Sequence, residues 1–342
     1  MTNSRVTAID LLKLMGCVAV VGLHTLNKDV SNYNAFLYFA CGFAVPIFFA
    51  TSGFFLLNRG KVTYKYTFDK ICGIVRLVML WNIIFWVYNI AKTFFKNEIT
   101  FKDLFYPIEI IKFFLQKGNC WHFWYLGALI LVYFCLPKLS RISEKKKSDF
   151  TILLFTICMC IQMISIYVGY PIQAKVIQTF RIWTWLLYFL IGGYMSRANE
   201  SISKYLSVNL HGVLMVFISL FIIIYQMYIG SNIITYIGKP NIMMNAEYFY
   251  DSIFTVAWII ILFTFILRIN INKKIINIIE ILSKFTIGVY CIHPLFVNVL
   301  SCFLVIDSFF EAILYWGLVL FLSFLTSLII SKSRIGKYIL KI

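Results

Sequence analysis

Long apolar runs constrain the fold of this 342-residue chain more than any other feature of its sequence. A membrane-crossing helix needs about 20 mostly apolar residues, and ten segments fit that description. They lie at residues 9–26, 36–57, 72–91, 123–139, 150–168, 182–196, 211–229, 253–268, 285–303 and 310–330. Transmembrane β-strands would be about ten residues long with alternating polarity. The pattern predicts an all-α integral membrane protein, a polytopic bundle of about ten helices, with residues 1–342 as a single membrane domain. The number of crossings could be nine to eleven, because the fourth and sixth runs are short.

The charged residues indicate which way the bundle faces. Only 13% of the residues are charged, and the net charge is +17. Of the 31 Lys and Arg residues, 20 fall on the side shared by the two termini and nine on the other, with Lys13 and Arg76 inside predicted helices. Cytoplasmic loops carry the excess of Lys and Arg in membrane proteins. We therefore expect both termini in the cytoplasm, and we attribute the positive charge to orientation and not to nucleic-acid binding.

The first predicted helix carries three ionisable side chains, those of Asp10, Lys13 and His24. Such groups are expensive at membrane depth and mark candidate functional sites. Lys13 and His24 are 11 residues apart, so they share one helix face and lie about 16 Å apart along its axis. A membrane histidine can also serve only to join helices, and a lysine can extend to the interface. The residues alone leave both interpretations open.

These side chains form the pattern R-x4-D-x2-K-x10-H (Arg5, Asp10, Lys13, His24), which resembles the amino-terminal signature of the membrane-bound acyltransferase-3 family. Further segments in the same order are similar to that family's later helices, and they include a Ser-Gly-Phe, an H-x-W-Y-L, a Gly-Tyr and an I-x-H-P pattern. These segments are Val45–Leu57, Trp121–Pro137, Phe180–Met195 and Leu282–Val297. The resemblance therefore extends along the whole chain.

The resemblance implies transfer of an acyl group, typically acetyl, from cytoplasmic acyl-CoA to a hydroxyl of a cell-surface glycan or its lipid-linked precursor. It also implies a multi-pass protein of a bacterial plasma membrane, surrounded by membrane lipids. Two positions depart from the family pattern. Lys13 stands where the family usually has arginine, and Lys70 with Arg76 replaces a more regular pair of arginines after the second helix.

Acyl transfer to a hydroxyl needs a base that takes the hydroxyl proton, and neutral imidazole suits that task near pH 7. We expect His24 to be this base, and we expect Asp10 to orient Lys13, so that these three are the catalytic candidates. Acetyl-CoA would present its phosphates to Lys13, Lys70 and Arg76. Direct transfer and a covalent acyl-enzyme both remain open.

The other histidines receive lower priority. His293 precedes Pro294 and is a candidate for substrate binding or for a structural role. For His122 we favour a position in the interfacial aromatic belt, and for Trp124 a position in the belt or the core. For both, contact with the acceptor sugar is the alternative. His211 is expected to be structural.

Signals for other chemistry are lacking in the sequence. The nine cysteines show no metal-type spacing, so no metal site is predicted. Motifs typical of nucleotide hydrolysis, zinc hydrolysis and serine esterases do not occur. The competing hypothesis is a transporter or flippase of a glycan or lipid-linked sugar. Many transporters consist of two similar halves, and this sequence shows no such internal repeat.

Overall fold

The computed structural model describes residues 7–95, 112–118, 120–232, 244–334, 336 and 340. Helices and short 3₁₀ turns make up the regular structure of these residues, which contain no strand. The helices are α1 (Thr7–Thr25), α2 (Asn32–Ala40), α3 (Ala44–Leu57), α4 (Tyr64–Phe95), α6 (Trp124–Leu139), α7 (Glu144–Val168), α8 (Ile182–Tyr205), α9 (Val208–Asn232), α10 (Ile253–Arg268), α11 (Lys273–Leu282), α12 (Thr286–Leu300) and α13 (Phe309–Lys332). The predicted all-α class is confirmed.

Each of the ten predicted spans coincides with one of these helices or with a pair of them. Among the described residues, eight helical segments are long and apolar enough to cross a membrane, so the chain is a multi-pass membrane protein. The two spans outside this group are α8, whose carboxyl-terminal half is polar, and α10, which has 16 residues. The apolar residues of these two helices are mostly buried, because both helices lie inside the bundle.

Two details of the prediction need correction. The span predicted at 36–57 is divided into α2 and α3, because the chain turns at Cys41, whose N–H bonds the carbonyls of Leu37 and Tyr38. Pro46 follows in the first turn of α3, where a missing N–H costs nothing. The second correction is α11, which occupies a stretch expected to be a loop. Its ten residues are too few to be recognised as a span.

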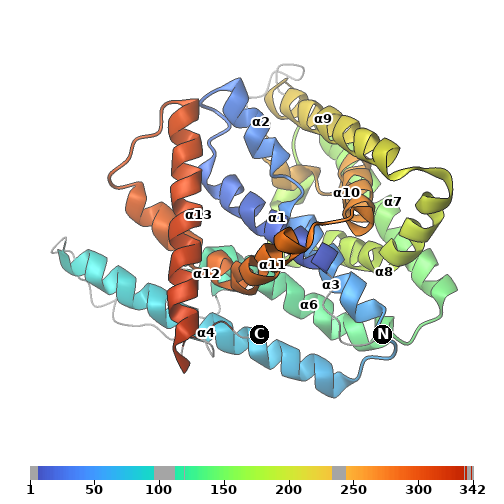
Figure 1. Ribbon diagram of the computed structural model, residues 1–342, viewed down its shortest axis with the longest axis horizontal. Coiled ribbons are helices and arrows are strands. Elements are labelled where there is room, and N and C mark those ends of the chain that lie inside the picture. Colours follow the sequence, from blue (N-terminus) through green and yellow to red (C-terminus); the bar gives the residue numbers. More distant parts are fainter. Residues whose placement is uncertain are drawn as a thin grey trace.

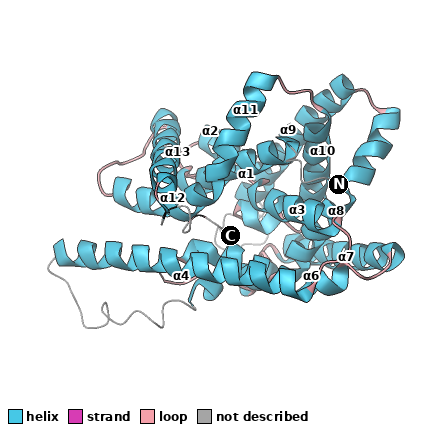
Figure 2. Cartoon of the chain, turned by 60° about the horizontal axis from the view of Figure 1, so that its bottom comes forward, coloured by secondary structure: helices cyan, strands magenta, loops and turns pink. Residues whose placement is uncertain are grey.

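The bundle has central and peripheral helices. In Figure 1, α1 and α3 cross its middle, while α13, α9 and α4 run along its edges, and Figure 2 shows α4 extending along one side. The peripheral helices expose large apolar side chains, which is expected where lipid replaces water as the solvent. Examples are Ile83 on α4, Phe217 and Phe221 on α9, and Leu314 and Phe321 on α13.

A close helix crossing joins α3 to α8 and depends on two glycines. A Cβ added to Gly53 would lie 1.8 Å from the carbonyl oxygen of Phe189, and one added to Gly192 would lie 2.0 Å from that of Ala50. Small residues let helix backbones approach this closely in membranes. The Ser-Gly-Phe and Gly-Tyr patterns of the sequence therefore mark the two sides of one helix contact.

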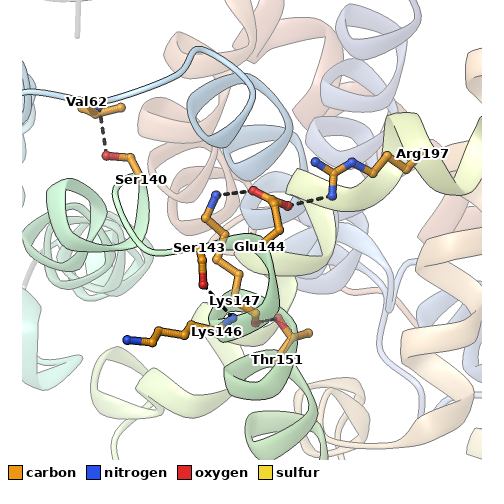
Figure 3. Close-up of polar contacts among 8 residues, drawn as sticks. All are labelled: Val62, Ser140, Ser143, Glu144, Lys146, Lys147, Thr151 and Arg197. Carbon is orange, nitrogen blue, oxygen red and sulfur yellow. Dashed lines mark hydrogen bonds and ion pairs between the residues drawn. The ribbon is translucent and has the colours of Figure 1, made fainter.

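Glu144 links two helices at the end of the bundle that is predicted to be cytoplasmic. Its carboxylate accepts from Lys147 Nζ at 2.8 Å and from Arg197 Nη1 at 2.7 Å, which connects the start of α7 to α8 (Figure 3). Nearby, the Ser140 hydroxyl accepts from the Val62 N–H at 3.0 Å. Because Glu144 and Arg197 are largely exposed, their pair contributes about 0–1 kcal/mol to stability.

Candidate active site

Three of the four histidines, from distant parts of the sequence, come together at the end of the bundle where α1 ends. His24 lies one residue before the end of α1, His122 lies in the turn that leads into α6, and His293 lies in the middle of α12. The ring of His293 is 5.2 Å from that of His24 and 5.9 Å from that of His122, measured between centroids. By the predicted orientation, this cluster lies in the outer half of the membrane.

The local structure of α12 fixes the proton of His293. Its Nδ1 lies 3.1 Å from the carbonyl oxygen of Val289, one turn earlier. A carbonyl oxygen only accepts, so Nδ1 carries the hydrogen and Nε2 holds a lone pair. The His293 side chain is fully buried, and its Nε2 has no hydrogen-bond partner among the described residues. His293 therefore presents a proton acceptor in a buried position.

His122 has the opposite tautomer. Its Nε2 lies 3.3 Å from the carbonyl oxygen of Cys291, so this nitrogen is the donor. Its Nδ1 is buried and lacks a partner in the described part of the chain. The Tyr290 hydroxyl donates to the backbone carbonyl of His122 at 2.5 Å, which ties the turn to α12. The His122 side chain is only 2% exposed and packs within the histidine cluster.

His24 is held between two rings. It stacks on His293 with 30° between the planes, and its other contact is the edge of Trp121, at 5.2 Å and 81°. The side chain is half-buried, which makes it the most accessible member of the cluster. The Trp316 indole on α13 donates to the carbonyl of Val18 at 3.2 Å and thereby supports the same helix.

The cluster offers proton acceptors and not a metal-binding arrangement. Among the described residues, no group of three or more His, Cys, Asp or Glu side chains is placed so that it could hold a metal ion. Two imidazoles instead use one nitrogen on a backbone carbonyl and keep the other for a ligand. A buried polar atom without a partner is costly. The arrangement is therefore suited to a ligand that donates hydrogen bonds, such as a hydroxyl group.

The candidate donor-binding residues come from two helices. Lys13 lies half-buried on α1, with its Nζ 4.9 Å from the centre of the Phe55 ring, and Asp10 is buried one turn before it. Lys70 and Arg76 are half-buried on α4. Lys13 and His24 share α1, so the predicted separation of about 16 Å holds for a continuous helix. Arg5 lies outside the described residues.

Two further candidates, Trp124 and His211, make their ring contacts with residues outside the histidine cluster. Trp124 is 7% exposed and packs on Trp185 with ring centroids 5.3 Å apart, as expected for a core residue. His211 pairs with Arg268, whose Nη1 lies 3.0 Å from its Nδ1, and it joins α9 to α10. This is the structural role expected for His211.

The sequence analysis missed two members of the site. Tyr290 fixes the backbone of His122, and Trp121 covers one side of His24. Tyr290 stands three residues before His293, a spacing that puts both side chains on one helix face. That spacing was a usable signal, whereas the contact between Trp121 and His24 depends on packing of α1 against the turn before α6.

The fold and the site define a multi-pass membrane protein with a buried cluster of proton-accepting imidazoles. Comparison with known proteins identifies its family: the family model described as an acyltransferase domain matches residues 6–332. The chain belongs to the acyltransferase-3 family and is a membrane acyltransferase. The residues that carried the resemblance, from Asp10 to Val297, lie within the matched range, and Arg5 lies just before it.

One curated relative and the solved structures complete the comparison. An amino-acid racemase of Enterococcus faecalis is 26% identical to the chain over 137 residues, which represent 38% of this chain and 18% of the racemase. The similarity thus covers about a fifth of that relative's length. No solved structure matches the chain.

Proposed function

We propose that this membrane acyltransferase is an O-acetyltransferase that moves an acetyl group from cytoplasmic acetyl-CoA to a hydroxyl of a cell-surface glycan or its lipid-linked precursor, in a bacterial plasma membrane. The observation that carries the proposal is the histidine cluster, in which His24 stacks on His293 and two buried nitrogens have no partner among the described residues. Such a site accepts protons from hydroxyl groups, which are the nucleophiles of O-acyl transfer.

His24 is the base in this proposal. The acceptor oxygen attacks the thioester carbonyl carbon, so that a carbon–oxygen bond forms and the carbon–sulfur bond breaks. The hydroxyl proton passes to His24, and the thiolate of coenzyme A leaves and takes up a proton. His293 and His122 accept hydrogen bonds from the acceptor through Nε2 and Nδ1, which orients the sugar hydroxyl toward His24.

The donor is proposed to bind along α1. Lys13 lies near the start of that helix and His24 near its end, so a long flexible thioester with its phosphates at Lys13 would place its acetyl group near His24. Lys70 and Arg76 would add charge toward the phosphates from α4. Asp10 would orient Lys13 from one turn earlier.

The test is transfer of a labelled acetyl group in membranes that contain or lack this chain. The proposal predicts label from acetyl-CoA in the surface glycan, and a mass gain of about 42 Da per modified site, only where the chain is present. Movement of unmodified glycan across vesicles without label transfer would instead support a carrier. Label that enters the glycan equally without the chain would overturn the proposal.

A further inference from the structure

A buried arginine lies at the same end of the bundle as the histidine cluster and has no assigned role. Arg181 directly precedes α8 and is only 4% exposed. Its Nε donates to the carbonyl of Val176 at 3.0 Å, while its Nη1 is buried and has no hydrogen-bond partner among the described residues. A buried charge is normally paired because it has lost its hydration. Arg181 therefore has a buried N–H group that no described residue satisfies.

The surroundings of Arg181 are polar and also incompletely paired. The hydroxyl oxygen of Thr179 and the side-chain carbonyl oxygen of Gln178 are buried without partners in the described part of the chain. The Tyr248 ring lies under the guanidinium, with its centre 5.4 Å from Cζ. An aromatic ring beside polar groups is a common surface for sugars to pack on. We define Gln178, Thr179, Arg181 and Tyr248 as the arginine pocket.

Two electrostatic features favour an anion in the arginine pocket. Arg181 immediately precedes the 24-residue helix α8, whose first N–H groups add partial positive charge at this point. Two carboxyls, those of Glu247 and Asp251, lie near enough for the charge of Arg181 to act on them, yet the ion pairs formed by the described residues do not include Arg181. Burial raises the pKa of Glu247, which the charge of Arg181 only partly offsets. Arg181 is thus buried without a direct ion pair to a carboxylate among the described residues.

The arginine pocket is connected to the histidine cluster through two tryptophans. The Trp185 indole donates to the carbonyl of Gln178 at 2.7 Å, and its ring packs on Trp124. Trp124 begins α6 directly after the turn that carries His122. The same loop is anchored on its other side, where Gln173 Nε2 donates to the carbonyl of Tyr248 at 2.7 Å. Both sites thus belong to one packed end of the bundle.

From these contacts we infer that the arginine pocket binds an oxyanion, a carboxylate or a phosphate, carried by the acceptor saccharide. This inference rests on the proposed function, because it names the chemical class of the acceptor. The guanidinium holds the oxyanion through paired N–H groups. The polar oxygens of Gln178 and Thr179 accept from sugar hydroxyls, and the target hydroxyl extends toward the histidines. Neutral saccharides would lack the main contact.

Binding can be measured on the purified full chain in nanodiscs, without any acyl donor. Three probes separate the possible sources of charge: D-glucuronate, N-acetylglucosamine 1-phosphate and neutral N-acetylglucosamine. A ligand that binds the folded chain raises its thermal midpoint by mass action. We expect the anionic probes to raise it and the neutral sugar to leave it unchanged. The anionic probe that raises the thermal midpoint more shows whether the group is a carboxylate or a phosphate.

Variants of the arginine pocket then identify the contact. Arg181→Gln should weaken binding of the anionic probe about tenfold or more, because a charge-assisted hydrogen bond is lost. Glu247→Gln should strengthen binding, since it removes a competing carboxylate. Arg197→Gln, at the opposite end of the bundle, should leave binding unchanged. If Arg181→Gln unfolds, Arg181→Lys and Glu247→Gln still change affinity in opposite directions.

The outcomes separate this inference from the proposed function. Equal midpoint shifts for neutral and anionic sugars, or unchanged anion affinity in the Arg181 variants, would overturn the arginine pocket while leaving acetyl transfer untouched. Conversely, anion binding that depends on Arg181 in a chain without acetyl transfer would support the pocket and overturn the proposed reaction.

Discussion

The imidazole of His293 stacks on that of His24 at 5.2 Å, with 30° between the two ring planes. The two side chains come from α12 and α1, at opposite ends of the sequence, and both helices are needed to form the contact. The tautomer of His293 is set by the Val289 carbonyl, so its free nitrogen is an acceptor before any substrate binds. In the proposed reaction, the Val289 carbonyl would orient His293 as a carboxylate orients the histidine of known acyl-transfer sites.

Replacing His293 tests the second imidazole. His293→Ala removes a buried hydrogen-bond acceptor beside the proposed base, and we expect acetyl transfer to fall by about 100-fold or more. The measurement is transfer of labelled acetyl from acetyl-CoA to membrane glycan, normalised to the amount of inserted protein. The matched control is His211→Gln, which changes a buried histidine outside the cluster and should retain activity. Equal activity in His293→Ala and the native chain would show that the stacking has no role in transfer.

Tyr290 is expected to act by positioning His122. Tyr290→Phe removes the hydrogen bond to the His122 carbonyl, worth about 1 kcal/mol, so kcat/KM should fall about fivefold. Tyr315 provides a control of the same chemistry, because its hydroxyl donates to the Val297 carbonyl of the same helix at 3.0 Å. Tyr315→Phe should lower thermal stability by a similar amount and leave kcat/KM unchanged. If both variants lose activity alike, Tyr290 contributes only to stability.

The α3–α8 crossing predicts a sharp difference between glycines. Gly53→Ala would place a methyl group against the Phe189 carbonyl, forcing the helices apart at a cost of about 1–3 kcal/mol or more. We expect a lower midpoint of thermal unfolding in detergent. Gly317→Ala on α13 has open space around the new methyl group and should be neutral or slightly stabilising. Similar midpoints for the two variants would contradict the close crossing.

Lys13 tests the donor side of the proposal. Lys13→Gln removes one positive charge from the proposed phosphate site, so KM for acetyl-CoA should rise about tenfold with a smaller change in kcat. Lys13→Arg should keep KM near the native value because it keeps the charge. These constants can be measured with labelled acetyl-CoA in inside-out vesicles. An unchanged KM in Lys13→Gln would remove Lys13 from the donor site.

Much of the fold could be predicted because lipid imposes a simple rule on the chain. Apolar runs of bilayer length predicted ten segments, each of which coincides with a helix or a pair of helices in the described residues, and the charged loops suggested an orientation. The break between α2 and α3 escaped notice, since both pieces are apolar and Gly42 is the single turn residue beside Cys41. Helix α11 escaped for the opposite reason, because ten residues with lysines at one end look like a loop.

The site was predicted less completely than the fold. His24 stood out because a lone imidazole in an apolar helix is expensive. His122 lies between aromatic residues at a helix start, a pattern that also suits a membrane interface, and only packing against α12 shows that it is buried. The partnership of the three histidines depends on contacts across 269 residues of sequence, from His24 to His293, which no local pattern contains. Arg181 was counted only as an outer charge, although it is buried.

The most direct test of the central claim is acetyl transfer by His24→Ala. Membranes that contain equal amounts of the native chain, His24→Ala or His211→Gln are supplied with labelled acetyl-CoA, and label in the surface glycan is measured. We predict transfer by the native chain and by His211→Gln, and transfer at the level of membranes without the chain for His24→Ala. Native-level labelling by His24→Ala would contradict the assignment of His24 as the base and, with it, the account of the histidine cluster.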